Sequence, residues 1–149
     1  MNHVLVLSPH LDDAAFSLGP LLAEFSTEAA VHVATPFTKS VEQPSGFALA
    51  CQLDKGLPAD VDYMELRRAE DRAWASELRL QVEHGDLAEA PHRGYADAQA
   101  LFAERLATDD LSERLSEWVT ELAQRHQPSL VFLPIGIGRH VDHLWVREI

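Results

Sequence analysis

Residues 3–35, HVLVLSPHLDDAAFSLGPLLAEFSTEAAVHVAT, decide the fold. The apolar run at 3–8 predicts a buried strand, which a Ser-Pro dipeptide ends. Residues 14–25 have a helical composition, and residues 30–35 are a second strand candidate. Strand, loop, helix and strand in this order predict a βαβ unit, whose connection between parallel strands is right-handed.

The rest of the chain repeats this alternation. Helical spacing returns near Tyr63, a short strand is expected at 80–83, and a longer amphipathic helix is expected at roughly 109–126. The continuous apolar run at 130–133 predicts a strand, and another helix is expected to begin at Val141. Strands that alternate with helices predict an α/β fold, a Rossmann-like three-layer sandwich with a mostly parallel sheet and helices on both faces.

The length of 149 residues suits one domain, so residues 1–149 are expected to form a single unit. Residues 36–61 lack sustained periodicity and contain three prolines and two glycines. A long loop of this kind is usually a functional lid or a mobile segment, so we expect an irregular, mobile loop there. The sequence stops at Ile149, about two turns into the last expected helix and without a stop signal, which predicts a domain truncated at its C-terminal end.

Composition excludes several classes of protein. The formal charge of -12 disfavours nucleic acid or an anionic membrane surface as the main partner. Cys51 is the only cysteine, so a metal site must be built from histidines and carboxylates. No apolar segment reaches the length of about eighteen residues that a membrane span requires. The first residues lack a basic start and a signal-like apolar stretch, which predicts a cytoplasmic protein.

Two polar clusters each follow an expected strand, Pro-His-Leu-Asp-Asp at 9–13 and Arg-His-Val-Asp-His at 139–143. Ligands of open α/β sheets bind at the carboxyl ends of strands, so we expect the clusters to face each other. Imidazole nitrogen and carboxylate oxygen suit zinc, which in catalytic sites takes three protein ligands and a water. His10, Asp13 and His143 are therefore the expected zinc ligands, although Fe²⁺, Co²⁺ or Mn²⁺ would also be accepted.

Other interpretations of these clusters remain open from the residues alone. The aspartates at 12–13 would also suit an N-cap of the following helix, and His-x-x-His on a surface helix often binds nothing. An acidic pair after the first strand also suits the Mg²⁺ of a receiver domain, but the apolar strand at 130–133 leads into Pro-Ile-Gly rather than an acceptor aspartate. A dinucleotide-binding module is disfavoured because the first turn lacks a Gly-x-Gly-x-x-Gly loop.

Three segments resemble the LmbE-like (PIG-L) family of N-acetylglucosaminyl deacetylases. SPHLDDAAFSLG at 8–19 resembles the first signature of the family, and GIGRHVDH at 136–143 resembles the second. RRAEDRAWASEL at 67–78 is similar to the arginine-rich helix of the family. Leu11 and Ala14 replace the commoner Pro and Glu, and neither position supplies a metal ligand. The likeness covers essentially the whole chain.

The resemblance also implies roles for single residues. The implied metal ligands are His10, Asp13 and His143. Asp12 would be the general base, and His140, if protonated, would stabilise the oxyanion. Asp142 would orient His140 or tune its charge.

The substrate contacts implied by the resemblance are less specific. Arg68 is a candidate contact to a substrate hydroxyl, with an exposed charge paired along its helix as the alternative. Apart from the resemblance, His92 is a candidate for the wall of the substrate cleft, because it lies beside the loop residues Arg93, Gly94 and Tyr95.

The expected function follows from the resemblance. It is a zinc-dependent hydrolase that removes an N-acetyl or other N-acyl group from an N-acetylglucosamine-type amino-sugar conjugate. Family members commonly run longer, so the alternative is an inactive or partner-completed metal-binding remnant of the deacetylase fold. The expected partner is a small molecule, and a homo-oligomer would cover an exposed edge of the sheet.

Overall fold

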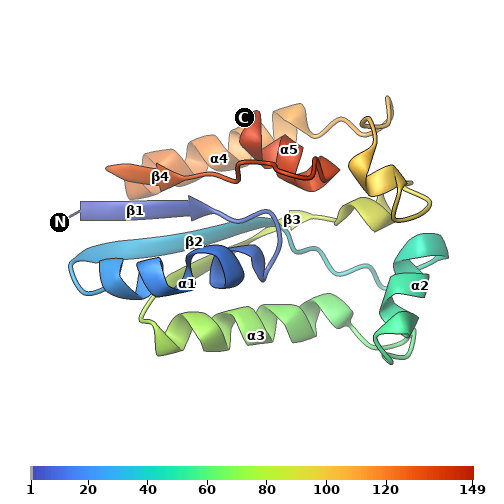
Figure 1. The fold of residues 1–149 in the computed structure, drawn as a ribbon, viewed down its shortest axis with the longest axis horizontal. Coiled ribbons are helices and arrows are strands. Elements are labelled where there is room, and N and C mark those ends of the chain that lie inside the picture. Colours follow the sequence, from blue (N-terminus) through green and yellow to red (C-terminus); the bar gives the residue numbers. More distant parts are fainter. Residues whose placement is uncertain (1) are drawn as a thin grey trace.

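A computed structural model of the chain describes residues 2–149. Four strands form one parallel sheet in the order β3-β2-β1-β4 (Figure 1). The strands are β1 (Asn2–Leu7), β2 (Ala29–Phe37), β3 (Gln81–Leu87) and β4 (Leu130–Phe132). Sequence neighbours β1 and β2 pair directly, and β4 returns to the other side of β1. The expected parallel α/β sheet is therefore confirmed.

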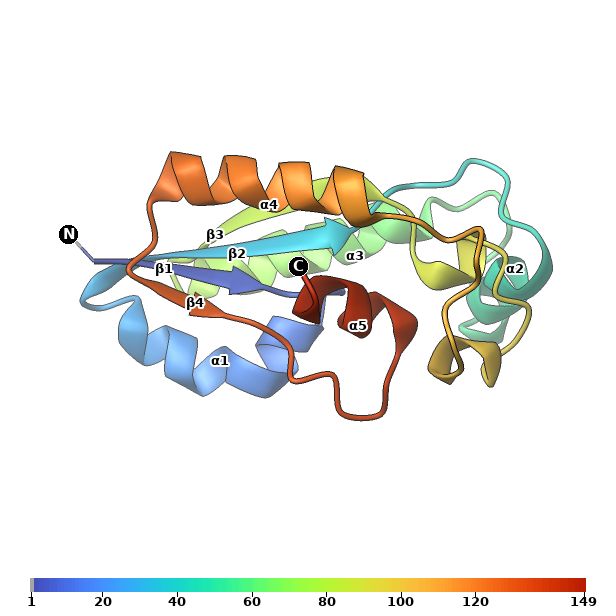
Figure 2. The same ribbon diagram turned by 90° about the horizontal axis from the view of Figure 1, so that it is seen from above.

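Helices cover both faces of this sheet, with α1 (Asp13–Phe25) and α3 (Tyr63–Glu77) on one face and α4 (Ser112–His126) and α5 (Val141–Arg147) on the other. Helix α2 (Gly46–Asp54) lies beyond the carboxyl ends of the strands (Figure 1). Along β1, Val4 and Val6 pack against α1 and α3, whereas Leu5 and Leu7 pack in the core that α4 and α5 close. Because successive side chains of a strand point to opposite faces, one apolar strand serves two cores. Figure 2 shows α4 and α1 on opposite sides of the sheet.

The segment 36–61 corrects one expectation, because Gly46–Asp54 form α2 instead of an irregular loop. Ala48 and Gln52 face inward with a spacing of four residues. The amide of Gln52 donates hydrogen bonds to the carbonyl oxygens of Pro58 (2.6 Å) and Val61 (3.0 Å), so the helix fastens the segment that follows it. A nine-residue helix between prolines and glycines is too short to produce a clear period in the sequence. The mobility of the segment stays a prediction.

Two boundaries also differ from the sequence expectation. Strand β3 runs to Leu87 rather than ending near residue 83, and it passes very close to β2 at Gly85. A Cβ at Gly85 would lie 2.7 Å from the carbonyl oxygen of Pro36, so the close approach requires glycine. Helix α4 begins at Ser112, not at 109, because Asp109 is buried and accepts hydrogen bonds from Arg93 and Tyr95.

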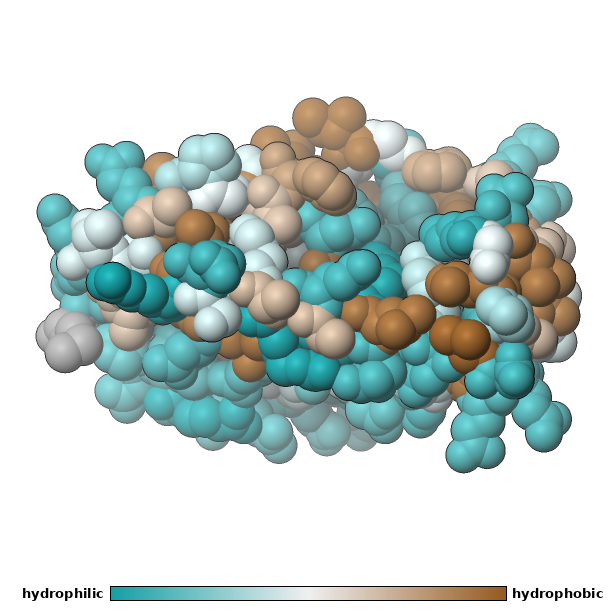
Figure 3. Space-filling model, turned by 90° about the horizontal axis from the view of Figure 1, so that it is seen from below, coloured by the Kyte–Doolittle hydropathy of each residue, from teal (hydrophilic) through white to brown (hydrophobic). Residues whose placement is uncertain are grey.

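The surface agrees with the acidic composition. The face seen in Figure 3 is largely hydrophilic, and its hydrophobic residues form separate groups, one at the upper rim near the middle and one toward the end of the molecule that carries α2. Leu53 of α2 is 52% exposed there. Among residues 2–149, no helix combines the length and the apolar character that crossing a membrane requires.

Candidate metal centre

The two polar clusters meet at the carboxyl ends of the adjacent strands β1 and β4. The turn between β1 and α1 is fixed by Ser8, whose hydroxyl donates to the carbonyl oxygen of His10 (2.7 Å) and accepts from the backbone N–H of Ala14 (3.1 Å). The second cluster opens α5, where the N-cap residue is His140. The sheet order thus brings together residues that lie far apart in sequence, as expected.

His10, Asp13 and His143 converge on one point. Oδ2 of Asp13 lies 3.4 Å from Nδ1 of His10 and 3.1 Å from Nε2 of His143. One ligand atom from each residue lies within 4.8 Å of the others, and all three side chains are partly exposed. Two imidazole nitrogens and one carboxylate oxygen at this separation fit a divalent metal that keeps an open position.

The side chains of the two aspartates do not cap α1, which was the alternative interpretation of this cluster. Asp12 occupies the N-cap position of α1, yet within residues 2–149 its side chain makes no capping hydrogen bond. The carboxylate of Asp13 instead accepts from the backbone N–H of His10 (2.9 Å), which precedes the helix. Both carboxylates are therefore available for chemistry outside the helix.

The other ring nitrogen of His10 is held by the second cluster. Nε2 of His10 lies 2.9 Å from Oδ2 of Asp142, whose side chain is completely buried. Metal-ligating histidines typically donate their second N–H to a carboxylate, which fixes the tautomer and the ring orientation. His10 therefore presents Nδ1 to Asp13, which is the arrangement that a metal ligand requires.

Asp142 is itself fixed by two further groups. Its Oδ2 accepts from the backbone N–H of Ala90 (3.1 Å), and its Oδ1 accepts from the guanidinium of Arg93 (2.7 Å). Burial raises the pKa of Asp142, but the hydrogen bond from His10 and the charges of His10 and Arg93 outweigh it and lower that pKa to about 2. The carboxylate is thus ionised. The carboxylate of Asp142 hydrogen-bonds these groups rather than His140. Its charge nevertheless acts on His140, where it opposes the lowering of the pKa by burial and by His10, so the expected charge-tuning role stays a prediction.

His140 is positioned through the backbone. The N–H of Asp142 donates to Nδ1 of His140 (3.2 Å), so a neutral His140 carries its proton on Nε2. Burial lowers the pKa of His140, and the charge on His10 lowers it further, to about 4. The expected role of His140 as the donor to an oxyanion was conditional on its being protonated. The structure favours the neutral imidazole, which remains a hydrogen-bond donor through Nε2.

The cluster attracts positive charge. Burial lowers the pKa of His10, but the hydrogen bonds with Asp13 and Asp142 reverse this and raise it to about 10. For Asp13, burial acts to raise the pKa, and the hydrogen bonds with His10 and His143 lower it far below its usual range. Two ionised carboxylates around one imidazole favour a cation at this position, and a metal ion satisfies the same demand.

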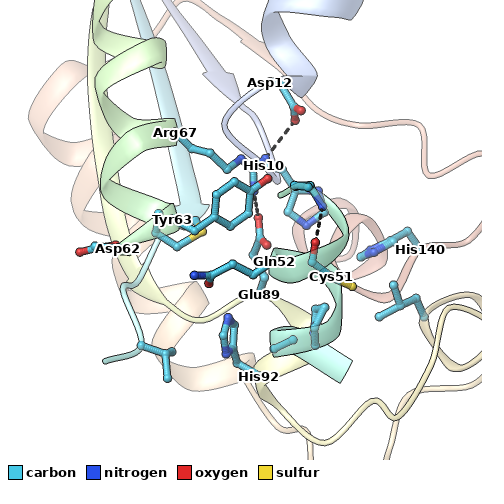
Figure 4. A pocket seen from close by; sticks show the side chains of 16 residues that line it. His10, Asp12, Cys51, Gln52, Asp62, Tyr63, Arg67, Glu89, His92 and His140 are labelled. Atoms are coloured by element: carbon cyan, nitrogen blue, oxygen red, sulfur yellow. Dashed lines mark hydrogen bonds and ion pairs between the residues drawn. The ribbon is translucent and has the colours of Figure 1, made fainter. Parts of the chain in front are cut away.

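A cavity of about 320 Å³ adjoins the cluster, and His10, Asp12 and His140 contribute to its wall. Arg67 of α3 reaches between two carboxylates at this wall (Figure 4). Its guanidinium donates to Oδ1 of Asp12 (3.3 Å) and forms an ion pair with Glu89. Arg67 thereby fixes the side chain of Asp12 beside the expected ligands.

The two expected substrate contacts lie in different places. His92 lines the cavity, and burial lowers its pKa. Arg68 lies outside the set of residues that form the cavity wall. Its guanidinium donates to Ser40 Oγ (2.8 Å), to Glu65 Oε2 (2.7 Å) and to the carbonyl oxygen of Thr38, so it anchors the chain after β2. Arg67, its neighbour in sequence, is the arginine that faces the cavity.

Sequence reasoning missed Arg67, Glu89 and Arg93. All three are charged residues that the structure holds largely buried, with side-chain exposures of 13%, 16% and 11%. Buried charges are normally paired, and here Arg67 pairs with Glu89 and Asp12, whereas Arg93 pairs with Asp109 and Asp142. The adjacent arginines at 67 and 68 gave no signal for which of them points to the cavity, because that depends on the rotation of α3 against the sheet.

Comparison with known proteins agrees with this geometry. The family model described as "PIG-L: GlcNAc-PI de-N-acetylase" matches residues 5–149. The 2'-N-acetylparomamine deacetylase of Streptomyces fradiae is 34% identical over 148 residues, which cover 98% of this chain and 50% of that protein. The chain thus spans about half the length of this curated relative.

Solved structures show the same likeness. A crystal structure of a deacetylase from the biosynthesis pathway of teicoplanin superposes with a TM-score of 0.86 and 31% sequence identity. A zinc-inhibited form of teicoplanin deacetylase superposes with a TM-score of 0.81 and 30% identity. In both cases the match covers 98% of this chain and 60% of the other.

Proposed function

The chain belongs to the PIG-L family of GlcNAc-PI de-N-acetylases, and we propose that it is a divalent-metal-dependent deacetylase of amino-sugar conjugates. The observation that carries this proposal is the convergence of His10, Asp13 and His143 beside a cavity whose wall includes Asp12. His10, Asp13 and His143 have the donor atoms of a catalytic metal site. Asp12 lies next to them and is not needed as a ligand.

In this proposal His10, Asp13 and His143 hold the metal, with Asp142 orienting His10 from behind. A divalent metal bound there supplies Lewis acidity, which polarises a carbonyl group and makes a water molecule more acidic. Zinc is the first candidate, and Fe²⁺, Co²⁺ and Mn²⁺ suit the same ligands.

Asp12 is the proposed general base. Its carboxylate is 55% exposed, lies on the cavity wall and is held by Arg67. It accepts a proton from the attacking water as the new C–O bond forms at the amide carbon. The same proton is then returned to the amine as the C–N bond breaks, so the products are a carboxylate and a free amine.

His140 is the proposed donor to the oxyanion. With Nδ1 occupied by the N–H of Asp142, its Nε2–H is free to stabilise the negative charge that develops on the carbonyl oxygen. A donor of this kind needs no positive charge, so the low pKa of His140 does not oppose the role.

The cavity suits a sugar ring. Its volume is about 320 Å³, and its wall combines polar groups with the ring of Tyr63. Side chains such as Asp62 and His92 provide polar groups for hydroxyl groups, while the aromatic face suits the apolar face of a sugar. The similar proteins are named as deacetylases of 2'-N-acetylparomamine and of teicoplanin-pathway compounds, which supports an amino-sugar unit within a larger molecule as the substrate.

One experiment tests the proposal on 2'-N-acetylparomamine and on simple N-acetylglucosamine conjugates, with release of primary amine as the readout. Asp12→Asn is expected to retain bound metal and lose turnover by about 10²–10⁴-fold. Asp13→Asn is expected to lose turnover together with the metal held by His10, Asp13 and His143. Asp86→Asn, on an exposed carboxylate near the end of β3, is the control that loses neither.

The outcomes separate the two functions considered. Turnover of Asp12→Asn at the wild-type rate contradicts the mechanism. Bound metal without turnover of any amide by the wild-type chain supports the alternative of a metal-binding remnant or a partner-completed site. A cytoplasmic location and a homo-oligomer stay predictions.

A further inference from the structure

A second group of histidines lies toward the amino-terminal ends of the strands, away from the metal centre. His3 comes from β1, His32 from β2, Glu83 from β3 and His126 from the last position of α4. The register pairs His32 with Leu5 and Glu83 with Ala34, both of which belong to the core beneath α4. The strand side chains of the group therefore face α4, whose C-terminal end brings His126 to them.

These side chains are in mutual contact. The ring centroids of His32 and His126 are 3.9 Å apart, and His3 stacks on His32 with centroids 6.0 Å apart. One oxygen of Glu83 bonds to Nε2 of His126, and the other pairs with Arg125. Ligand atoms of His32, Glu83 and His126 lie within 4.8 Å of one another, the same criterion that the metal centre meets.

The group also contains polar atoms without partners. Nδ1 of His32 and Nδ1 of His3 are buried and have no hydrogen-bond partner among the residues that the structure describes. His32 is only 5% exposed, so water does not readily satisfy this nitrogen. A buried polar atom left unpaired costs stability, and a bound ligand at this point would remove that cost.

We propose that His32, Glu83 and His126 form a second divalent-metal site of the zinc class, with His3 stacked beside it. Imidazole nitrogens together with a carboxylate oxygen are ligands that suit Zn²⁺. The ion would join the C-terminal end of α4 to the strands β2 and β3, so its role is to stabilise the fold. A cation also suits the C-terminal end of a helix, where the backbone carbonyl groups point outward. This inference does not rest on the proposed deacetylase activity.

Zinc stoichiometry tests the second site. The full chain is stripped of metal with a chelator, dialysed against a low excess of Zn²⁺ and assayed by elemental analysis. The wild type is expected to bind two equivalents of zinc, and Asp13→Asn and His126→Gln are each expected to bind one. Arg125→Gln is the matched control, because it removes a contact to the same Glu83 without removing a ligand, and it is expected to keep two.

Substitutions at His32, Glu83 or His126 could impair folding. The single variant Asp13→Asn leaves these three residues unchanged, so it tests the second site even in that case. Zinc is expected to raise the melting temperature of Asp13→Asn and to leave that of the Asp13→Asn/His126→Gln double variant unchanged. Loss of all zinc from Asp13→Asn, or two equivalents in His126→Gln, overturns the proposal. Deacetylase assays do not enter this test, so its failure is distinct from failure of the proposed function.

Discussion

His10 and Asp142 are 132 residues apart in sequence, yet Nε2 of the first lies 2.9 Å from Oδ2 of the second. This hydrogen bond joins the turn after β1 to the first turn of α5. Because Arg93 binds the other oxygen of Asp142, a third segment of the chain is tied to the same contact. The orientation of an expected metal ligand thus depends on the packing of three distant segments.

Replacing Asp142 with asparagine tests this dependence. Asparagine keeps the shape of the side chain but removes the charge that fixes the tautomer of His10, so metal affinity is expected to fall by about 10–100-fold. The affinity is measured by competition with a chromophoric chelator. Asp97→Asn, on an exposed carboxylate that caps the short turn at Ala100, is the control. Unchanged metal affinity in Asp142→Asn would show that the contact with His10 does not orient a ligand.

The protonation state of His140 leads to a prediction about pH. Its pKa is lowered to about 4 by burial and by the positive charge at His10, and a bound metal ion places positive charge at the same point. His140 is therefore neutral from about pH 5 to pH 8, and kcat is expected to show no fall over this range from its deprotonation. His140→Gln is expected to keep the metal and to lower kcat by about 10²–10³-fold. A falling limb near pH 6.5 that His140→Gln abolishes would instead favour the protonated form.

Asp109 is expected to make stability depend on pH. Burial raises its pKa, but hydrogen bonds from Arg93 and Tyr95 outweigh burial and lower that pKa below its ordinary value. A depressed pKa in the folded state contributes stability above the unfolded pKa of about 4, and this contribution is lost as the pH falls through the folded value. Asp109→Asn is expected to lower the free energy of unfolding by about 1.5–3 kcal/mol at neutral pH and by less in acid.

The control for this prediction is the next residue. Asp110 is exposed and bonds to Ser112 at the start of α4, so Asp110→Asn is expected to have a much smaller effect at neutral pH. Urea unfolding of both variants and of the wild type, at neutral and at acidic pH, measures the difference. An equal loss of stability for Asp109→Asn at both pH values would contradict the linkage.

Gly85 is expected to be intolerant of a side chain. A Cβ there would lie 2.7 Å from the carbonyl oxygen and 2.8 Å from Cα of Pro36, so β2 and β3 must separate. We expect Gly85→Ala to lower stability by about 1–3 kcal/mol in thermal unfolding. Both close contacts are to backbone atoms, so adding Pro36→Ala is not expected to restore stability. Recovery in the double variant would show that the ring of Pro36 causes the clash.

Much of the fold could be predicted because β1, β2 and β4 are short, mostly apolar runs. Such runs are typical of parallel strands that are buried on both faces, which holds for the central strands β1 and β2. Strand β4 lies at the edge of the sheet, where Leu130 and Val131 stay exposed. Helix α2 could not be predicted in this way, since only Ala48 and Gln52 face inward from its nine residues. Helix α4 begins later than expected because its first candidate residue, Asp109, is used by Arg93 instead.

The candidate metal ligands could be predicted because each cluster directly follows a strand, and strand order determines where they meet. The supporting residues could not, since their roles depend on side-chain direction. The carboxylate of Asp142 hydrogen-bonds His10 rather than His140, and Arg67 rather than Arg68 faces the cavity. These choices depend on the rotation of α3 and α5 against the sheet, which a local pattern does not encode.

The most direct test of the account is anomalous X-ray scattering from crystals of the chain equilibrated with Zn²⁺. The account predicts one anomalous peak that lies about 2.0–2.2 Å from each of three atoms, Nδ1 of His10, Oδ2 of Asp13 and Nε2 of His143. A saturated crystal without an anomalous peak among these three side chains would contradict the central claim that they form one metal centre.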